Sequence, residues 1–93
     1  MILFLSGPMT GLPNYNREAF FEAEKRLSSK GDIILSPAYL PEGLSHEHYF
    51  WICKAYLGVS DAIYLLKGHR ESRGSRLELE YARNLRLKIL KER

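Results

Sequence analysis

The sequence has a single cysteine, Cys53, among its 93 residues. One cysteine cannot form a disulfide within the chain, which excludes a small disulfide-stapled secreted scaffold and fits a reducing, cytoplasmic compartment. The sequence also lacks an apolar run near the roughly 20 residues that a membrane span needs. Its apolar residues 1–5 have no basic lead-in and stop at Ser6-Gly7-Pro8, so we expect neither a signal peptide nor a membrane partner.

Metal-ligating side chains are equally sparse. His46 and His48 lie two residues apart and do not share a helical face, and His69 is distant in sequence. No spacing of cysteine and histidine matches a known type of metal site. We therefore predict no metal and no cofactor.

The length and apolar content are enough for one core. With 45% apolar residues, the 93-residue chain is expected to form a single domain over residues 1–93. Small domains are marginally stable alone, so association into a homo-oligomer, a dimer or higher, is a reasonable way to bury more surface.

The apolar periodicity alternates between strand and helix. Strands are predicted at residues 2–5, 33–35, 62–66 and 87–90, and helices at 16–30, 46–59 and 74–86, with Asn16 and Ser45 as helix caps. This order requires right-handed crossovers and predicts a three-layer, doubly wound α/β fold, with a parallel sheet of about four strands and helices on both faces. Ligands of such folds bind at the carboxyl ends of the strands, which here lead into residues 6–15, 37–43 and 67–75.

The first of these loops, Ser6-Gly7-Pro8-Met9-Thr10-Gly11, offers backbone amides, hydroxyls and glycines that permit close approach of a ligand. Its glycine spacing matches neither a dinucleotide-binding fingerprint nor a P-loop. A purely structural turn is the alternative interpretation of its composition.

The third loop lies in a basic part of the chain. Residues 67–93 hold nine Lys and Arg against four Asp and Glu, whereas residues 1–66 hold five against seven. The segment Ser72-Arg73-Gly74-Ser75 opens a helix, where free amides and the helix dipole favour an anion and where Arg73 or Arg76 could clamp a phosphate. The alternative is that both arginines are solvated surface residues.

Glu78 has two interpretations. Ser75-Arg76-Leu77-Glu78 fits a capping box, in which the glutamate only satisfies an amide at the helix end. Glu78 also shares a helical face with Ala82, which would place its carboxylate toward the sheet as a nucleophile or general base. Cys53 is more simply a small core residue, and Tyr15, Tyr39 and Tyr49 could stack on a base, although packing is the simpler role for each.

Three segments resemble the signature segments of the nucleoside 2-deoxyribosyltransferase-like superfamily. They are Phe4-Leu5-Ser6-Gly7-Pro8-Met9-Thr10-Gly11-Leu12-Pro13-Asn14-Tyr15-Asn16, Ser60-Asp61-Ala62-Ile63-Tyr64-Leu65-Leu66 and Ser72-Arg73-Gly74-Ser75-Arg76-Leu77-Glu78. The segments occur in the family's order across nearly the whole chain. The sequence is most similar to the small, functionally uncharacterised branch of phages and bacteria.

The resemblance implies a flavodoxin-like fold, oligomeric assembly and chemistry at the N-glycosidic bond of a deoxynucleoside or its 5′-monophosphate. Glu78 matches the family's nucleophilic glutamate, whose attack on C1′ of the sugar displaces the base and forms a covalent glycosyl-enzyme. The matching substrate-binding residues, which would hold the sugar and phosphate of a nucleoside or nucleotide, are Ser6, Gly7, Pro8, Met9, Ser72, Arg73, Gly74 and Ser75.

Two positions depart from the family's pattern. Phe4 replaces a tyrosine whose hydroxyl helps to position the nucleophile, so that hydrogen bond is expected to be missing. Cys53 replaces an aspartate near the leaving base, so the expected proton donor is missing. General acid assistance of this kind is worth about 10²–10⁴ in rate. The alternative function is therefore a nucleotide-binding module with weak or no catalysis, and a third, disfavoured one is nucleic-acid binding through the basic residues near the end of the chain.

Overall fold

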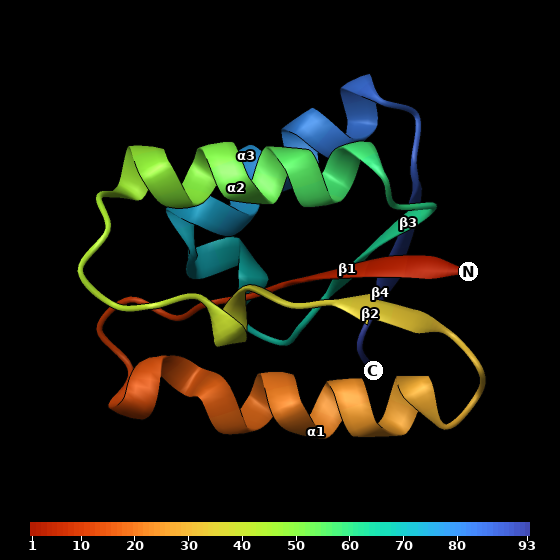
Figure 1. Ribbon diagram of the computed structural model, residues 1–93, viewed down its shortest axis with the longest axis horizontal. Coiled ribbons are helices and arrows are strands. Elements are labelled where there is room, and N and C mark those ends of the chain that lie inside the picture. The colour runs from red at the N-terminus through yellow and green to blue at the C-terminus, as the bar shows by residue number, and fades with distance from the viewer.

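A computed structural model describes residues 1–93, in which strands and helices alternate along the chain (Figure 1). The strands are β1 (Ile2–Ser6), β2 (Ile33–Leu35), β3 (Ala62–Leu65) and β4 (Lys88–Lys91), and the helices are α1 (Arg17–Ser28), α2 (His46–Gly58) and α3 (Arg73–Asn84). Short 3-10 turns, η1 (Pro13–Asn16), η2 (Pro37–Tyr39) and η3 (His69–Glu71), follow the first three strands. Every strand and helix predicted from the periodicity is present.

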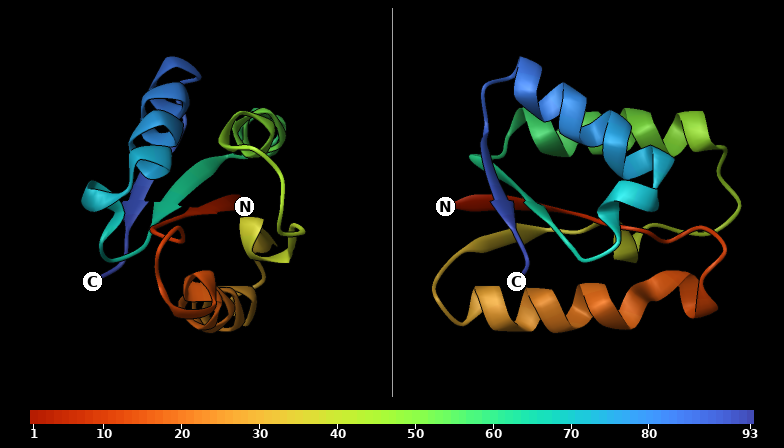
Figure 2. Two further views of the ribbon diagram at one scale, coloured as in Figure 1. Left: turned by 90° about the vertical axis from the view of Figure 1, so that its left-hand side faces the viewer. Right: turned by 180° about the vertical axis from the view of Figure 1, so that it is seen from behind.

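The four strands form one parallel sheet in the order β2-β1-β3-β4. α1 covers one face of the sheet, and α2 and α3 lie together on the other (Figure 2). The predicted three-layer, doubly wound parallel fold is thus confirmed. Because all strands run the same way, the loops that follow β1, β2 and β3 gather at one edge of the sheet, on the left in Figure 1.

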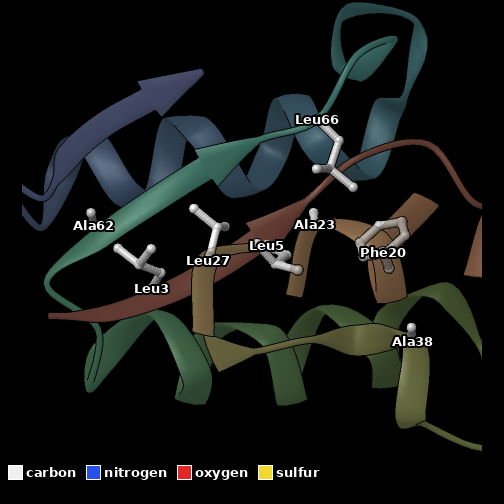
Figure 3. Close-up of a cluster of buried hydrophobic side chains, with 8 residues drawn as sticks. All are labelled: Leu3, Leu5, Phe20, Ala23, Leu27, Ala38, Ala62 and Leu66. Atoms are coloured by element: carbon white, nitrogen blue, oxygen red, sulfur yellow. The ribbon is translucent and has the colours of Figure 1, made fainter. Parts of the chain in front are cut away.

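Successive side chains of β1 point to opposite faces of the sheet, so this strand contributes to the hydrophobic cores on both faces. Leu3 and Leu5 point toward α1, whereas Phe4 points toward α2 and α3 and is fully buried. The α1 side holds eight buried side chains, drawn in Figure 3: Leu3, Leu5, Phe20, Ala23, Leu27, Ala38, Ala62 and Leu66. The opposite side holds Phe4, Cys53, Leu57, Ile63, Leu65 and Ala82. The period of two also places Ser6, two residues after Phe4, on the face that α2 and α3 cover.

The helix starts differ in part from expectation. Ser45 caps α2 as predicted, since its Oγ accepts a hydrogen bond from the His48 amide at 3.1 Å. Asn16 occupies the N-cap position of α1 as predicted, but its backbone is left-handed (φ 59°) and its side chain makes no capping hydrogen bond. Its Nδ2 instead donates to the Pro8 carbonyl at 2.9 Å, which ties the start of α1 to the loop after β1. None of the helices combines the length and apolar character needed to span a membrane.

Candidate functional site

A cavity of about 750 Å³ opens at the carboxyl ends of the strands. Its walls come from the three loops that follow β1, β2 and β3, together with the first turns of α2 and α3. The cavity lies at the position where doubly wound folds bind ligands, and its volume is within the usual range for small-molecule sites.

Glu78 lies in the wall of this cavity, on the side of α3 that faces the sheet. Its Oε1 accepts a hydrogen bond from the Ser6 hydroxyl at 2.7 Å, across 72 residues of sequence. The residue is partly buried, and the loss of water around its carboxyl raises the pKa of Glu78 to about 7, although the hydrogen bond from Ser6 lowers it. The carboxyl group therefore gains or loses a proton near neutral pH. Ser6 hydrogen-bonds only Oε1 and leaves Oε2 without a contact to that residue.

The capping-box interpretation of Glu78 is wrong. The residue that caps α3 is Ser72, whose Oγ accepts a hydrogen bond from the Ser75 amide at 3.2 Å. Helix α3 thus begins at Arg73, so Glu78 lies in its second turn, beyond the reach of the free amides at the helix start. Its carboxyl is directed at β1.

Phe4 offers no hydrogen bond to Glu78, as expected from its side chain, but another residue of β1 does. Phe4 has no hydroxyl and packs against Tyr56, with ring centroids 6.1 Å apart. Ser6, one repeat further along the same face of β1, supplies a hydroxyl to Glu78 instead. Ser6 is completely buried and does not line the cavity, so its hydroxyl contacts the Glu78 carboxyl from the protein interior.

Cys53 is a core residue, as the sequence suggested, but it also lies next to the carboxyl group. It is 2% exposed and belongs to the cluster beneath α2 and α3, and it also reaches the cavity wall. Burial first, and the Glu78 charge second, raise the pKa of the Cys53 thiol, which stays protonated at neutral pH. A neutral thiol beside Glu78 in turn lowers the pKa of that carboxyl group.

The start of α3 has the features of an anion site. Ser72, Arg73, Gly74 and Ser75 all line the cavity. The Ser75 side chain is 1% exposed, yet its Oγ has no hydrogen-bond partner within the protein. An unsatisfied buried hydroxyl is costly and indicates a ligand or water at that point. Arg76 is not part of this site, because its Nη1 donates to the Arg70 carbonyl at 2.9 Å.

The loop after β1 forms another part of the cavity wall. Gly7, Pro8 and Met9 line the cavity. Gly7 has no room for a side chain, because a Cβ there would lie 2.9 Å from Cβ of Leu66. This glycine therefore lets the loop pass close to the end of β3.

The sequence placed the loop after β2 at the site but did not indicate that the first half of α2 lines it. The loop after β2 and the first half of α2 contribute apolar, acidic and aromatic side chains, among them Leu40, Leu44, His46, Glu47, Tyr49 and Phe50. The position of residues 37–43 after a strand indicated a ligand loop, but nothing in the periodicity of α2 marked its first turns as lining the site. No three His, Cys, Asp or Glu side chains lie close enough together to hold a metal ion.

Comparisons with known proteins agree with this fold. The chain has a TM-score of 0.78 to a solved structure described as "2-desoxiribosyltransferase from Leishmania mexicana", at 17% sequence identity. The alignment covers 97% of this chain and 62% of that one, and at this identity it establishes the fold alone. No curated protein sequence matches the chain. Residues 1–91 match the family described as "Domain of unknown function (DUF4406)", and the chain belongs to that family.

Proposed function

We propose that the protein cleaves the N-glycosidic bond of a deoxynucleoside or its 5′-monophosphate, as a hydrolase or a deoxyribosyltransferase, with Glu78 as the nucleophile. The observation that carries this proposal is the Ser6–Glu78 hydrogen bond of 2.7 Å, which fixes a carboxyl group in the wall of a cavity of ligand size. The fold shared with a 2-deoxyribosyltransferase supports the same choice of chemistry.

The proposed reaction assigns different roles to the two carboxyl oxygens of Glu78. Oε1 of Glu78 is held by Ser6, which leaves Oε2 to attack C1′ of the sugar. The new C1′–O bond forms as the bond from C1′ to the base nitrogen breaks, and the electron pair leaves with the base, which takes up a proton from solvent water. Water, or a second base, then attacks C1′ and releases the Glu78 carboxylate.

The 5′-phosphate would lie at the start of α3. Free amides at this helix end and the dipole favour an anion, and the unpartnered hydroxyl of Ser75 supplies one more donor. Arg73 lines the same part of the cavity and would add a charge-assisted contact. A phosphate held there fixes the sugar between Glu78 and the loop containing Gly7, Pro8 and Met9.

A binding module of the same fold is the second candidate, and Cys53 favours it. The thiol beside Glu78 is a poor acid because its pKa is raised, so it gives the departing base little help. Under this alternative the cavity binds nucleotides without turnover. We also propose that the protein belongs to the branch found in phages and bacteria, that it is cytoplasmic and that it assembles as a homo-oligomer.

Base release separates the two candidates. Each deoxynucleoside and its 5′-monophosphate is incubated with the protein at high concentration, and the free base is measured by chromatography. The enzyme proposal predicts release that disappears in Glu78→Gln and persists in Glu80→Gln, a matched change on an exposed glutamate of α3 outside the cavity. Thermal stabilisation by nucleotides without any base release would support the binding module, since a ligand at about 100 times its Kd adds about 2.7 kcal/mol.

A further inference from the structure

Three consecutive residues of the turn before α1 have an unusual backbone. Asn14, Tyr15 and Asn16 have φ angles of 49°, 54° and 59°. Asparagine tolerates this left-handed conformation, but an aromatic residue rarely adopts it. Strained backbone of this kind persists where the surroundings fix it, and it concentrates at ligand sites.

Hydrogen bonds hold the turn in place from both ends. Asn16 Nδ2 donates to the Pro8 carbonyl at 2.9 Å, and the Tyr15 amide donates to the Leu12 carbonyl at 2.9 Å. Asn14 Nδ2 donates to Glu18 Oε1 at 3.1 Å. The polar side chains of this turn thus fix the backbone on which the Tyr15 ring is mounted.

The Tyr15 ring lies in the cavity wall with a cation over one of its faces. The side chain is 41% exposed, takes no part in either core cluster and lines the cavity. The Arg17 guanidinium lies over the ring, 5.1 Å from its centroid. Arg17 is itself fixed to the loop after β2, through the Ala38 carbonyl at 3.3 Å and Glu42 at 3.2 Å. A cation on one face of the ring leaves the other face for a second flat group.

The other two candidate tyrosines have different surroundings. Tyr39 lies outside the cavity, donates to Glu24 Oε1 at 2.6 Å and packs on Phe21. Tyr49 reaches the cavity, but its hydroxyl donates to the Pro41 carbonyl at 2.5 Å and is anchored in the loop that it supports. Tyr15 is therefore the tyrosine whose ring is both fixed and available.

We propose that Tyr15, with Arg17 over one face of its ring, is the surface on which the base of the ligand stacks, and that it determines the preference among bases. This inference rests on the proposed nucleotide ligand but is independent of catalysis. Stacking of a base on an aromatic ring tolerates every base but favours those with the larger flat surface, so we expect purines to bind more tightly than pyrimidines.

Binding to three variants tests this inference, in a Glu78→Gln background so that no ligand is consumed. The ligands are the four deoxynucleoside 5′-monophosphates and 2-deoxyribose 5-phosphate, which has no base, and affinity is measured by calorimetry. Tyr15→Asn removes the ring but suits the left-handed backbone, Tyr15→Phe keeps the ring, and Tyr39→Asn is the same change on a tyrosine outside the cavity.

Tyr15→Asn is expected to weaken nucleotide binding by about 5- to 100-fold and to leave the affinity for 2-deoxyribose 5-phosphate unchanged. Tyr15→Phe and Tyr39→Asn should bind like the parent. Equal loss for both kinds of ligand, or no loss for either, overturns the role of Tyr15. Absence of nucleotide binding in the parent overturns the proposed function as well, whereas Tyr15-dependent binding without base release in the protein with Glu78 intact overturns only the catalytic proposal.

Discussion

Replacing Ser6 by alanine tests how the protein controls its buried carboxyl group. The substitution removes the 2.7 Å hydrogen bond that stabilises the charged form of Glu78, while the burial that opposes this form remains. A hydrogen bond to a charged group contributes about 1.5–3 kcal/mol, and 1.36 kcal/mol corresponds to one pH unit in a pKa. Ser6→Ala should therefore raise the pKa of Glu78 by about one to two pH units.

The consequence at neutral pH is large. With a pKa of about 7, Glu78 is about half ionised at pH 7. In the variant the ionised fraction falls to about 1–10%, so any reaction that needs the carboxylate slows about 5- to 50-fold at pH 7 and recovers at higher pH. A purely structural role of Ser6 would lower activity at every pH without moving the profile.

Carbon NMR of the Glu78 carboxyl, titrated between pH 4 and 10, measures the pKa without requiring turnover. Ser60→Ala is the matched control, because Ser60 is also a buried serine with a 2.7 Å hydrogen bond, to the Tyr56 carbonyl, but it precedes β3 at the opposite end of that strand from the cavity. A Glu78 pKa that stays constant or falls in Ser6→Ala would refute the reasoning.

Three further predictions concern stability, measured by urea or thermal unfolding. Ser75→Ala should leave the free protein unchanged or stabilise it by up to about 1 kcal/mol because it removes an unsatisfied buried hydroxyl, whereas Ser72→Ala should destabilise it by about 0.5–2 kcal/mol through loss of the α3 cap; destabilisation of equal size in both would contradict this. Gly7→Ala should destabilise the protein by about 1–3 kcal/mol because the new Cβ meets a side chain at 2.9 Å, whereas Gly58→Ala, with open space around it, should stabilise the protein by about 0.4–1 kcal/mol. Equal effects of the two substitutions would contradict this reasoning. Between pH 4.5 and about 7 the native state keeps the Glu78 proton that the unfolded chain releases, so stability falls as pH rises through this window. The free energy of unfolding of Glu78→Gln should therefore exceed that of the parent by about 3 kcal/mol at pH 8 but not at pH 4. A constant difference across pH would argue against a buried carboxyl.

The fold was predictable because each element carries its own signal. The run Ile2 to Leu5 and the periodic apolar residues of α1 to α3 specify strands and helices locally, and their alternation dictates a parallel sheet. The place of the ligand loops then follows from topology. Asn16 makes no capping hydrogen bond because its backbone is left-handed rather than extended, and its side-chain Nδ2 donates to the Pro8 carbonyl, a contact that the local pattern does not encode.

The detailed site depends on pairings between distant segments. The period of β1 puts Ser6 on the same face as Phe4, but only the arrangement of the layers brings α3 over that face and so joins Ser6 to Glu78. The capping-box spacing around Glu78 misled for a similar reason, because Ser72 offered an earlier cap and helix α3 began at Arg73. The cavity wall from the loop after β2 is likewise a product of how three loops meet.

A crystal structure of Glu78→Gln with a bound deoxynucleoside 5′-monophosphate tests most directly whether residue 78 is placed for attack. We predict that the side-chain amide lies about 3 Å from C1′, with the phosphate at the start of α3 beside the Ser75 hydroxyl. A nucleotide bound with C1′ out of reach of residue 78, or bound outside this cavity, would contradict the proposed role of Glu78.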